Sequence, residues 1–564
     1  MLFFALFAWL CVAQAQDVVP PGTTLEDADA VQLSEEGLAN LGANLGVLIP
    51  SPVPVDDITQ SGGVTCANFD LLITNMLVDV EVSGASLVPL ASNSDARADL
   101  QLQIDLLVAI NDATNKFGLD YAFDFCLTSP DGSCPGYIEP FPVTVRGPVS
   151  ILVVDDGSGT GETTLDVQIG DLEVVNGLQG EDIKLDCGIG TLESLLNRVG
   201  LSFFDLIINA LDPVLQGLIQ DQVGDLEAQL SEALAAASVD QVIDLQGIAL
   251  RLRLYPGSAT STPAGLQLGL DGFTEGTPDS TCVPLVPSGS AFTDSEALPD
   301  LAQLGTTDAA LQLSDDFANQ ALFEIWKGGL LCLELGEGAE SSLDIGLPLN
   351  SSLLGLIGGD EFSALFPEDG PLLIRTNPVK PPEVNYDGAN DVVLEIRDLG
   401  LDMYAELDFR MARPLGMTIE ADAGIDVLFD NTTGVAAIDL ALGPDEVRPE
   451  ATMVEVAPSA KETVEQNFQG LLDSLLDTLL GSALEGLSFG LPSLDGFGIT
   501  ELDLGGSAGG EWLTGAAELG VVSYPSGGCD EGCSGGTDSG CSTGGAAPWL
   551  LMVVVPLLRR RSDS

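Results

Sequence analysis

The chain carries the decapeptide VQLSEEGLAN at residues 31–40 and nearly repeats it as LQLSDDFANQ at residues 311–320. In each copy an apolar-Gln-Leu-Ser segment precedes two acidic residues and a helix-like run. Ser34 and Ser314 can each accept a hydrogen bond from a backbone N–H of the first helical turn, and acidic residues there suit the positive end of the helix dipole. Each copy is therefore predicted to be a short strand that leads into a capped helix. Since serine followed by acids is a common helix start, the repeat is significant only if longer segments also match.

The segments that follow the two decapeptides do match in order. After the first, alternating apolar residues predict strands, then a long helix, then further strands. These are strands at 70–84, 98–110, 141–156 and 163–175, a helix at 190–238 that Pro213 should kink or restart, and a strand at 242–255. After the second come strands at 391–409, 416–430 and 434–442, a leucine-striped helix at 462–487, and closing strands. A loose Pro/Gly/Ser/Thr-rich stretch at 256–299 separates the halves. We therefore interpret the chain as a duplication.

The charge and the histidine content restrict the possible functions. The chain has 86 acidic and 18 basic residues, a net charge of −68, and no histidine. Such a surface is a poor partner for nucleic acid and for anionic lipid, and we interpret the acidity as a means of solubility. The alternative is calcium binding at DDGSGTGE, residues 155–162, which has oxygen ligands but not the EF-hand order.

Without histidine, Ser-His-Asp and Cys-His catalysis and histidine metal sites are excluded. The sequence has no Walker loop, nucleophile elbow or GxGxxG in a βαβ context. We therefore expect a protein that is not an enzyme, with no catalytic residues, metal or cofactor. The enzymatic alternative is an exported hydrolase that relies on carboxylates alone.

Both ends of the chain predict export. Residues 1–15 have the apolar core and small residues of a signal peptide, with cleavage expected after Ala15. At the other end, a Gly/Ser spacer precedes an apolar run at 546–558 and three arginines. The run is shorter than the about 20 residues of a membrane span. This order resembles the cysteine-containing sorting tail of myxobacterial surface proteins, which implies processing and attachment near Cys529, Cys533 and Cys541. The alternative is a plain, weak membrane anchor.

Six cysteines remain in the body of the chain, and an even number in an exported protein suggests disulfides. Cys66, Cys126, Cys134 and Cys187 lie in the first half, and their pairing is left open. Cys282 and Cys332 are alone in the second half and form the natural pair.

The order of elements over residues 20–523 resembles the bactericidal/permeability-increasing and lipopolysaccharide-binding protein family of the tubular lipid-binding (TULIP) superfamily. The resemblance rests on the two helix openers, AVQLSEEGLANLGANLGVLIPSP (30–52) and its repeat, on ALFPEDGPLLIRTNPVKPPEVNY (364–386), and on EGLSFGLPSLDGFGITELDL (485–504). It implies an α+β fold of two tandem elongated barrels, each a twisted antiparallel sheet wrapped around a long amphipathic helix, joined by a central sheet into a boomerang.

The expected domains follow from this resemblance and from the two ends. They are a signal peptide (1–15), a first lipid-binding barrel (16–255), a connection and central-sheet region (256–305), a second lipid-binding barrel (306–523), a Gly/Ser/Cys spacer (524–545), and an apolar sorting or anchor segment with an arginine cluster (546–564).

The resemblance also implies that each barrel holds a phospholipid-like ligand between its helix and sheet. The groove candidates are the apolar residues of the two long helices, for which ordinary core packing is the alternative. They are Phe203, Phe204, Ile207, Ile208, Leu211 and Leu215 in the first helix, and Phe468, Leu471, Leu472, Leu475, Leu476 and Leu479 in the second.

Two features depart from the family. Family members that bind lipopolysaccharide use surface lysines and arginines. Since these residues are scarce in this chain, we do not expect it to bind lipopolysaccharide. The family's disulfide joins a strand to the first long helix, but no cysteine lies between Leu192 and Leu234. That bridge must use another position, such as Cys187, or be absent.

These observations together predict a secreted, surface-attached protein that binds or transfers lipid by holding acyl chains in apolar grooves. Its partners would be a phospholipid or similar acyl lipid and, through the tail, a membrane surface. Its place would be the bacterial cell surface or outer membrane, or the medium after release. The alternative is a structural or adhesive surface protein with the same fold and packed, ligand-free barrels.

Overall fold

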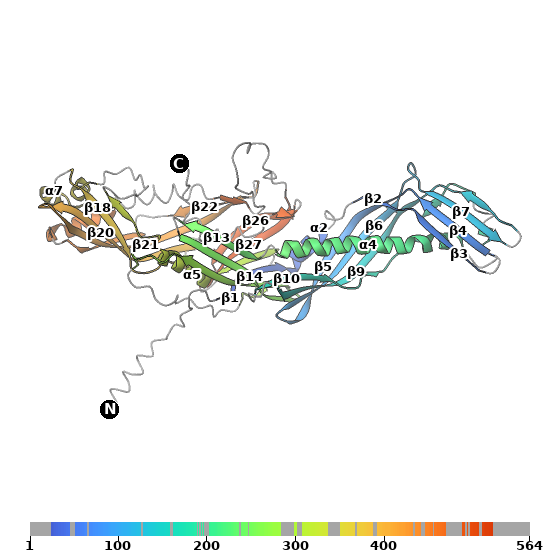
Figure 1. Ribbon diagram of the computed structural model, residues 1–564, viewed down its shortest axis with the longest axis horizontal. Coiled ribbons are helices and arrows are strands. Elements are labelled where there is room, and N and C mark those ends of the chain that lie inside the picture. The colour runs from blue at the N-terminus through green and yellow to red at the C-terminus, as the bar shows by residue number, and fades with distance from the viewer. Residues whose placement is uncertain are drawn as a thin grey trace, which may run out of the picture.

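The computed structural model shows an elongated, mostly β molecule (Figure 1). A central sheet lies between two sheet-rich ends, one that carries β4 and β7 and one that carries β18 and α7. The structure describes residues 24–44, 51–64, 67–125, 128–157, 162–188, 190, 193, 194, 196, 202–235, 238–245, 248–283, 298–301, 307–336, 350–366, 369–386, 392–432, 435–441, 446–454, 456–469, 488–490, 493, 494, 497–506 and 510–522.

The central sheet has eight strands, and the two repeated decapeptides meet at its middle. The strand order is β13 (Val239–Leu245), β14 (Ile248–Thr262), β15 (Gly265–Thr277), β1 (Leu25–Ser34), β16 (Ala309–Ser314), β27 (Trp512–Val521), β26 (Phe497–Gly506) and β25 (Ser493–Leu494). β1 and β16 are antiparallel, with Val31 opposite Leu311. Since these are equivalent positions of the repeat, the two strands are related by an approximate two-fold axis.

The neighbouring contacts follow the same symmetry. The backbone N–H of Glu35 donates to the carbonyl of Ala264, and that of Asp315 donates to the carbonyl of Glu511, both at 2.9 Å. The helices that follow are α2 (Glu35–Asn44) and α5 (Asp315–Gly328).

The predicted helix caps are confirmed in both copies. The Oγ of Ser34 accepts from the backbone N–H of Gly37 at 3.0 Å, and the Oγ of Ser314 accepts from that of Phe317 at 3.2 Å. The strand-then-capped-helix interpretation of the decapeptides therefore holds.

One end of the molecule is built on a curled antiparallel sheet and the long helix α4 (Phe203–Ala235). Its strand order is β10 (Thr163–Ile169), β9 (Gly136–Asp155), β6 (Arg97–Ile110), β5 (Met76–Ser94) and β2 (Val53–Val55), with β11 (Glu173–Val174) and β12 (Ile183–Leu185) also paired to β9. A smaller sheet at the tip has the order β3 (Ile58–Val64), β4 (Ala67–Thr74), β7 (Gly118–Phe125) and β8 (Asp131–Ser133). The strand expected at 70–84 is divided between the two sheets at Asn75, whose φ is 56°.

Pro213 does not restart the long helix, because α4 runs through it without a break. A proline leaves the carbonyl four residues earlier without its helical partner. That residue is Asn209, and both Asn209 and Pro213 are exposed. Solvent can therefore satisfy the carbonyl that the proline leaves unpaired.

The opposite end is a second curled sheet. Its strand order is β17 (Glu334–Gly336), β18 (Leu372–Pro378), β20 (Val392–Leu407), β21 (Arg410–Asp430), β22 (Val435–Ala441) and β24 (Ser488–Gly490), with β19 (Glu383–Asn385) on β20 and β23 (Val447–Met453) on β21. It also carries α6 (Ser352–Gly358), α7 (Asp360–Leu365) and the 3-10 turn η3 (Pro458–Ala460). Residues 461–469 are helical, and the rest of the helix expected at 462–487 lies outside the described residues.

The expectation of a loose connection at 256–299 is wrong for its first part, which completes β14 and forms all of β15. The glycines that suggested a loop allow neighbouring elements to pack closely on β15. A Cβ at Gly272 would lie 2.4 Å from the Cβ of Ala28 and 2.5 Å from the ring of Phe317, and one at Gly276 would lie 2.8 Å from the carbonyl oxygen of Glu324. These glycines therefore reflect the contact of β15 with β1 and α5.

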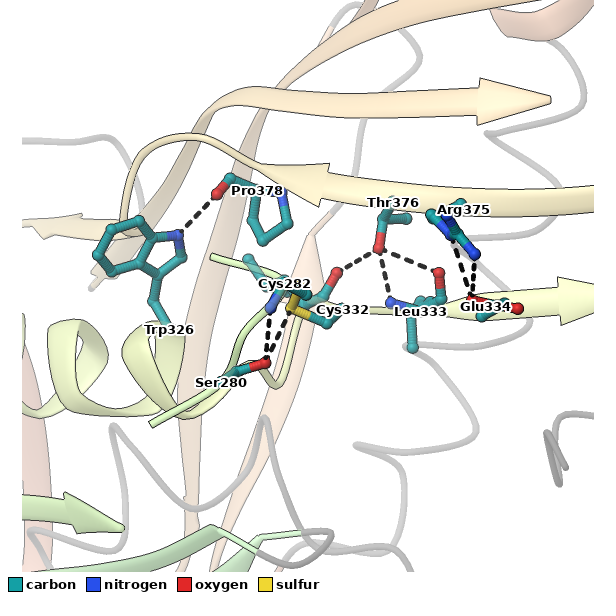
Figure 2. The surroundings of a disulfide bond; sticks show 10 residues. Ser280, Cys282, Trp326, Cys332, Leu333, Glu334, Arg375, Thr376 and Pro378 are labelled. Atoms are coloured by element: carbon teal, nitrogen blue, oxygen red, sulfur yellow. Dashed lines mark hydrogen bonds and ion pairs between the residues drawn. A yellow bond between two sulfur atoms is a disulfide. The ribbon is translucent and has the colours of Figure 1, made fainter. Parts of the chain in front are cut away.

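Two disulfides join described residues, Cys134–Cys187 and Cys282–Cys332. The second confirms the predicted pair, and Figure 2 shows it at the junction between the end of α5 and β18. Nearby, the indole N–H of Trp326 donates to the carbonyl of Pro378 at 3.1 Å, and the backbone N–H of Leu333 donates to Thr376 at 2.7 Å. Cys66 and Cys126 lie outside the described residues.

Candidate lipid-binding groove

A small apolar cavity lies between α4 and the curled sheet. Its volume is about 40 Å³, and every side chain that lines it is apolar except Gln222. The sheet contributes Val80 from β5, Ile104, Leu106 and Val108 from β6, and Phe141, Val143 and Val145 from β9; α4 contributes Leu215, Leu218, Ile219, Gln222 and Val223.

The sheet side of the cavity follows from strand alternation. Along β6, buried residues alternate with more exposed ones from Ala98 to Ile110, because successive side chains of a strand point to opposite faces. Ile104, Leu106 and Val108 therefore share the face that α4 covers. The apolar wall is thus built into the two-residue period of the strand sequence.

The first turns of α4 are anchored rather than open. Phe203 is fully buried and contacts two rings from β7, with centroid distances of 5.5 Å to Tyr121 and 6.1 Å to Phe123. Ile207 and Leu211 are also buried in the same core, and Phe204 and Ile208 are half-buried against it. These five candidates pack in the core, and the sixth, Leu215, lines the cavity.

The cavity therefore lies farther along α4 than most of the candidate residues. Leu218, Ile219, Gln222 and Val223 line it but were not among them. Their positions continue the spacing of three and four residues from Leu215 that marks one face of a helix. The signal was present in the sequence, but it could not distinguish a cavity wall from a packed core.

Polar contacts attach the later part of α4 to the edge strand β10. Glu227 Oε2 accepts from the backbone N–H of Ile169 at 2.9 Å, and Ser231 Oγ accepts from that of Val167 at 3.3 Å. Before the helix, the disulfide Cys134–Cys187 ties the chain to the segment between β8 and β9. The part of α4 over the cavity thus lies between an anchored start and a hydrogen-bonded end.

In the other curled sheet, Phe468 is buried and packs in a core with Val464 and Leu415. The other groove candidates of the predicted second long helix lie outside the described residues; they are Leu471, Leu472, Leu475, Leu476 and Leu479. The tail residues Cys529, Cys533 and Cys541 also lie outside the described residues.

The carboxyl groups whose pKa values are raised most by burial lie in and beside the central sheet and do not line the cavity. Burial raises the pKa of Asp29 to about 8, and it raises the pKa values of Asp271 and Asp315 to about 6. Burial also raises the pKa of Tyr386, and the nearby Asp315 and Asp29 add to this effect. None of these groups faces the cavity, so they give it no acid or base.

Most basic side chains are neutralised by neighbouring acids. In the part of the chain that the structure describes, every lysine and arginine except Arg146 and Arg410 forms an ion pair with a carboxylate. Within the same residues no group of three or more acids or cysteines is arranged to hold a metal ion. None of the described helices has the length and apolar character that a membrane span requires.

A second, polar pocket of about 240 Å³ lies where β10, β13 and β14 meet. Its charged lining consists of three acids, Asp156, Glu162 and Asp240, and one base, Arg253, which forms ion pairs with Glu162 and Asp240.

The comparisons with known proteins concern the fold. No family model matches the chain, and neither does any curated protein. Among solved structures, it is similar to lipopolysaccharide binding protein, with 15% identity, a TM-score of 0.49, and coverage of 89% of this chain and 100% of that one. It is also similar to P47 of Clostridium botulinum E1, with 10% identity, a TM-score of 0.24, and coverage of 88% and 100%. A third similar structure is Takeout 1 of Epiphyas postvittana, with 8% identity, a TM-score of 0.17, and coverage of 32% and 78%.

Proposed function

We propose that this protein binds or transfers acyl lipid without catalysis, and that it is exported and attached to the bacterial cell surface by its C-terminal tail. The observation that carries the proposal is the cavity between α4 and the sheet, whose lining is apolar except for Gln222. A mostly apolar, concave site with few polar groups is typical of small-molecule binding.

The mechanism is partition of an acyl chain between water and this apolar groove. Each CH₂ group contributes about 0.8 kcal/mol, so one acyl chain costs on the order of 10 kcal/mol to expose to water. A carrier must therefore cover the chain, and a groove between a helix and a sheet does so without any chemical step. No catalytic residue is needed, and the proposed role is not that of an enzyme.

An acyl chain enters this groove only if α4 moves. The cavity of about 40 Å³ would hold only a few water molecules. The anchored start of α4 at Phe203 leaves the middle of the helix, from Leu215 to Val223, as the part that would separate from β6 and β9. The bonds of Glu227 and Ser231 to β10 would limit that movement.

The proposal includes the finer architecture and its origin. The chain would consist of two tandem barrels, each with one long amphipathic helix, that arose by duplication and meet at the central sheet. Support comes from the pairing of Val31 with Leu311 and from the two equivalent caps at Ser34 and Ser314. The second groove would then lie along the helix that begins near residue 461.

The expected ligand is a neutral or zwitterionic lipid, held by its chains. The net charge of −68 repels phosphorylated headgroups. Arg251, Arg253, Arg375 and Lys380, which could have formed a basic patch, each form an ion pair with an acid. Lipopolysaccharide is therefore not the proposed ligand.

The second candidate function is a structural or adhesive surface protein whose barrels hold no ligand. The small volume of the cavity favours this candidate, because the side chains of α4 and the sheet already fill most of the space between them.

A solvent extract of the purified full-length protein distinguishes the two functions. We expect mass spectrometry of the extract to find acyl lipid in a fixed ratio to protein, near one or two per chain. The same protein, delipidated and carried again through the purification in buffer without lipid, is the control for adventitious lipid. An extract that contains no more lipid than this control would contradict the proposal and support the structural role.

A further inference from the structure

The turn between β20 and β21 holds a phenylalanine that contributes nothing to the core. Leu407 pairs with Arg410, so Asp408 and Phe409 are the two central residues of the hairpin turn. Their φ values are 49° and 62°. Two-residue turns with positive φ at both positions strongly favour Asn-Gly or Asp-Gly, and a bulky residue there is an outlier. The side chain of Phe409 is 96% exposed.

This turn therefore carries an aromatic residue against the local conformational preference and without any compensating burial. Glycine in place of Phe409 would make the same turn with less strain. Because the stability of the fold does not explain Phe409, its presence suggests a contact with another molecule.

Other exposed apolar residues lie at the same end of the molecule. Met411, the second residue of β21, is 50% exposed. Leu356 of α6 is 63% exposed, and Leu365 of α7 is 40% exposed. α7 and β20 lie together at this end (Figure 1). The chain places them there because β18 follows α7 closely and pairs Leu372 with Ala405, just before the turn. We refer to Leu356, Leu365, Phe409 and Met411 as the apolar tip.

An unpaired cation lies within the apolar tip. Among the described residues, Arg410 is the basic side chain for which the structure shows neither a hydrogen bond nor an ion pair, whereas Arg146 donates to Gln103 Oε1 at 2.9 Å. In a chain with 86 acidic residues, a guanidinium without a carboxylate partner is unusual. Phe409, Arg410 and Met411 thus place a free cation between two exposed apolar side chains.

We propose that the apolar tip docks onto the surface of an electroneutral, zwitterionic lipid bilayer. Phenylalanine and other apolar side chains can be buried at the boundary between the headgroups and the acyl chains, and a guanidinium can donate two hydrogen bonds to a lipid phosphate. The pairing of β18 with β20 ends at Ala405 and that of β23 with β21 ends at Gly416, so the hairpin turn extends past both neighbouring strands. Phe409 and Met411 can therefore enter the bilayer surface while Arg410 stays at the headgroups.

The charge of the chain selects this partner over others. A second copy would bring another net charge of −68, which opposes association. The exposed acids near the tip, Asp360, Glu361 and Asp408, would repel an anionic bilayer. A zwitterionic surface has no net charge to repel and still presents phosphates to Arg410.

The inference rests on the proposed function, because a protein that loads or delivers acyl lipid must reach a bilayer. The apolar tip would make this contact, and its residues are far in the sequence from the α4 groove. The test is a full-length chain with Phe409→Trp, mixed with phosphatidylcholine vesicles that carry brominated acyl chains. Bromine quenches only tryptophan that enters the bilayer, so the signal is local to position 409 and is not produced by binding of another segment.

The matched control is Val242→Trp, since Val242 is 64% exposed on β13 in the central sheet. The wild-type chain gives the background from its own tryptophans. We expect quenching with Trp at 409 and none with Trp at 242. Quenching at neither position, or equal quenching at both, would overturn the proposal.

The variant Phe409→Gly separates docking from folding. We expect its melting temperature to be equal to or above that of the wild type, because glycine accepts the positive φ, while its partition onto the vesicles falls about tenfold through loss of a buried phenyl ring. Arg410→Gln should weaken partition several-fold with no change in melting temperature. Self-association of the wild type without vesicles, lost in Phe409→Gly, would overturn the proposal in favour of a second copy.

The outcomes also separate this proposal from the proposed function. Lipid in the solvent extract without quenching at 409 would leave lipid binding in place and remove the docking surface. Quenching at 409 with no lipid in the extract would support the docking surface and remove the groove.

Discussion

Filling the cavity under α4 with one methylene should reveal whether the cavity stays ligand-free or admits an acyl chain. Val143 lies near the middle of β9, is 4% exposed and lines the cavity. Val143→Ile keeps a β-branched side chain, so the preference of β9 for the strand is retained. The change therefore acts mainly through the volume between the sheet and the helix.

The magnitude follows from the size of the cavity. At roughly 24 cal/mol per Å³, a cavity of about 40 Å³ destabilises the delipidated protein by about 1 kcal/mol. One buried methylene contributes about 0.8 kcal/mol, which is close to the whole of that deficit. For a unit of about 200 residues this corresponds to a rise of about 2–3 °C in melting temperature.

The matched control is Val149→Ile, also on β9. Val149 is 3% exposed in the same core but does not line the cavity. An added methylene there meets packed atoms and should destabilise by about 1 kcal/mol or more. Scanning calorimetry of both delipidated full-length variants measures the difference.

Lipid content provides the second readout of the same variant. If the groove holds an acyl chain, Val143→Ile should reduce the lipid in a solvent extract while the delipidated protein becomes more stable. If the barrels are ligand-free, stability rises and the extract does not change. Equal destabilisation by Val143→Ile and Val149→Ile would refute the reasoning, because it would mean that no usable space exists beside Val143.

Four further outcomes are expected. Ile219→Asp, which places a carboxylate on the cavity wall, should retain the fold and lose most bound lipid; a folded variant with full lipid content in its extract would count against a groove at α4. Ser34→Ala and Ser314→Ala should each lower the free energy of unfolding by about 1 kcal/mol in urea titrations, and unequal effects would show that the two caps are not equivalent. The melting temperature should rise with sodium chloride, because added salt shortens the Debye length from about 30 Å at 0.01 M to about 8 Å at physiological strength; a flat curve would mean that the acids are already compensated. Burial raises the pKa of Asp29 from 3.8 to about 8, so the stability that the protonated carboxyl contributes is fully present below pH 4 and is lost as the pH rises through 8. Asp29→Asn should therefore flatten the decline of the free energy of unfolding between pH 6 and 8. An unchanged slope would assign that decline to other groups.

The helix starts could be predicted because they depend on neighbours in the chain. Ser34 and Ser314 each cap a helix whose first N–H groups lie only three residues away, and the acids that follow act on the same turn. The strand alternation of β6 is local in the same sense, since it depends only on the two-residue period. The pair Cys282–Cys332 could be predicted by elimination within one half of the chain.

The errors came from residues whose role depends on distant elements. Gly272 and Gly276 suggested a loop, but they lie in β15, where Ala28, Phe317 and Glu324 leave no room for a Cβ. Pro213 suggested that the helix kinks or restarts, but α4 does not restart there, since the position of Pro213 on the solvent side allows the helix to continue. In both cases the residue type was identified correctly and its surroundings were not.

The candidate site shows the same division. The sequence by itself determined which face of α4 is apolar, because the spacing of Leu211, Leu215 and Leu218 fixes that face. Only the tertiary structure decided that Phe203 to Leu211 fill a core whereas Leu215 to Val223 border a cavity. The physical reason is that a cavity is the volume left between surfaces, and the separation of α4 from β6 and β9 is set by side chains that are far from α4 in the sequence.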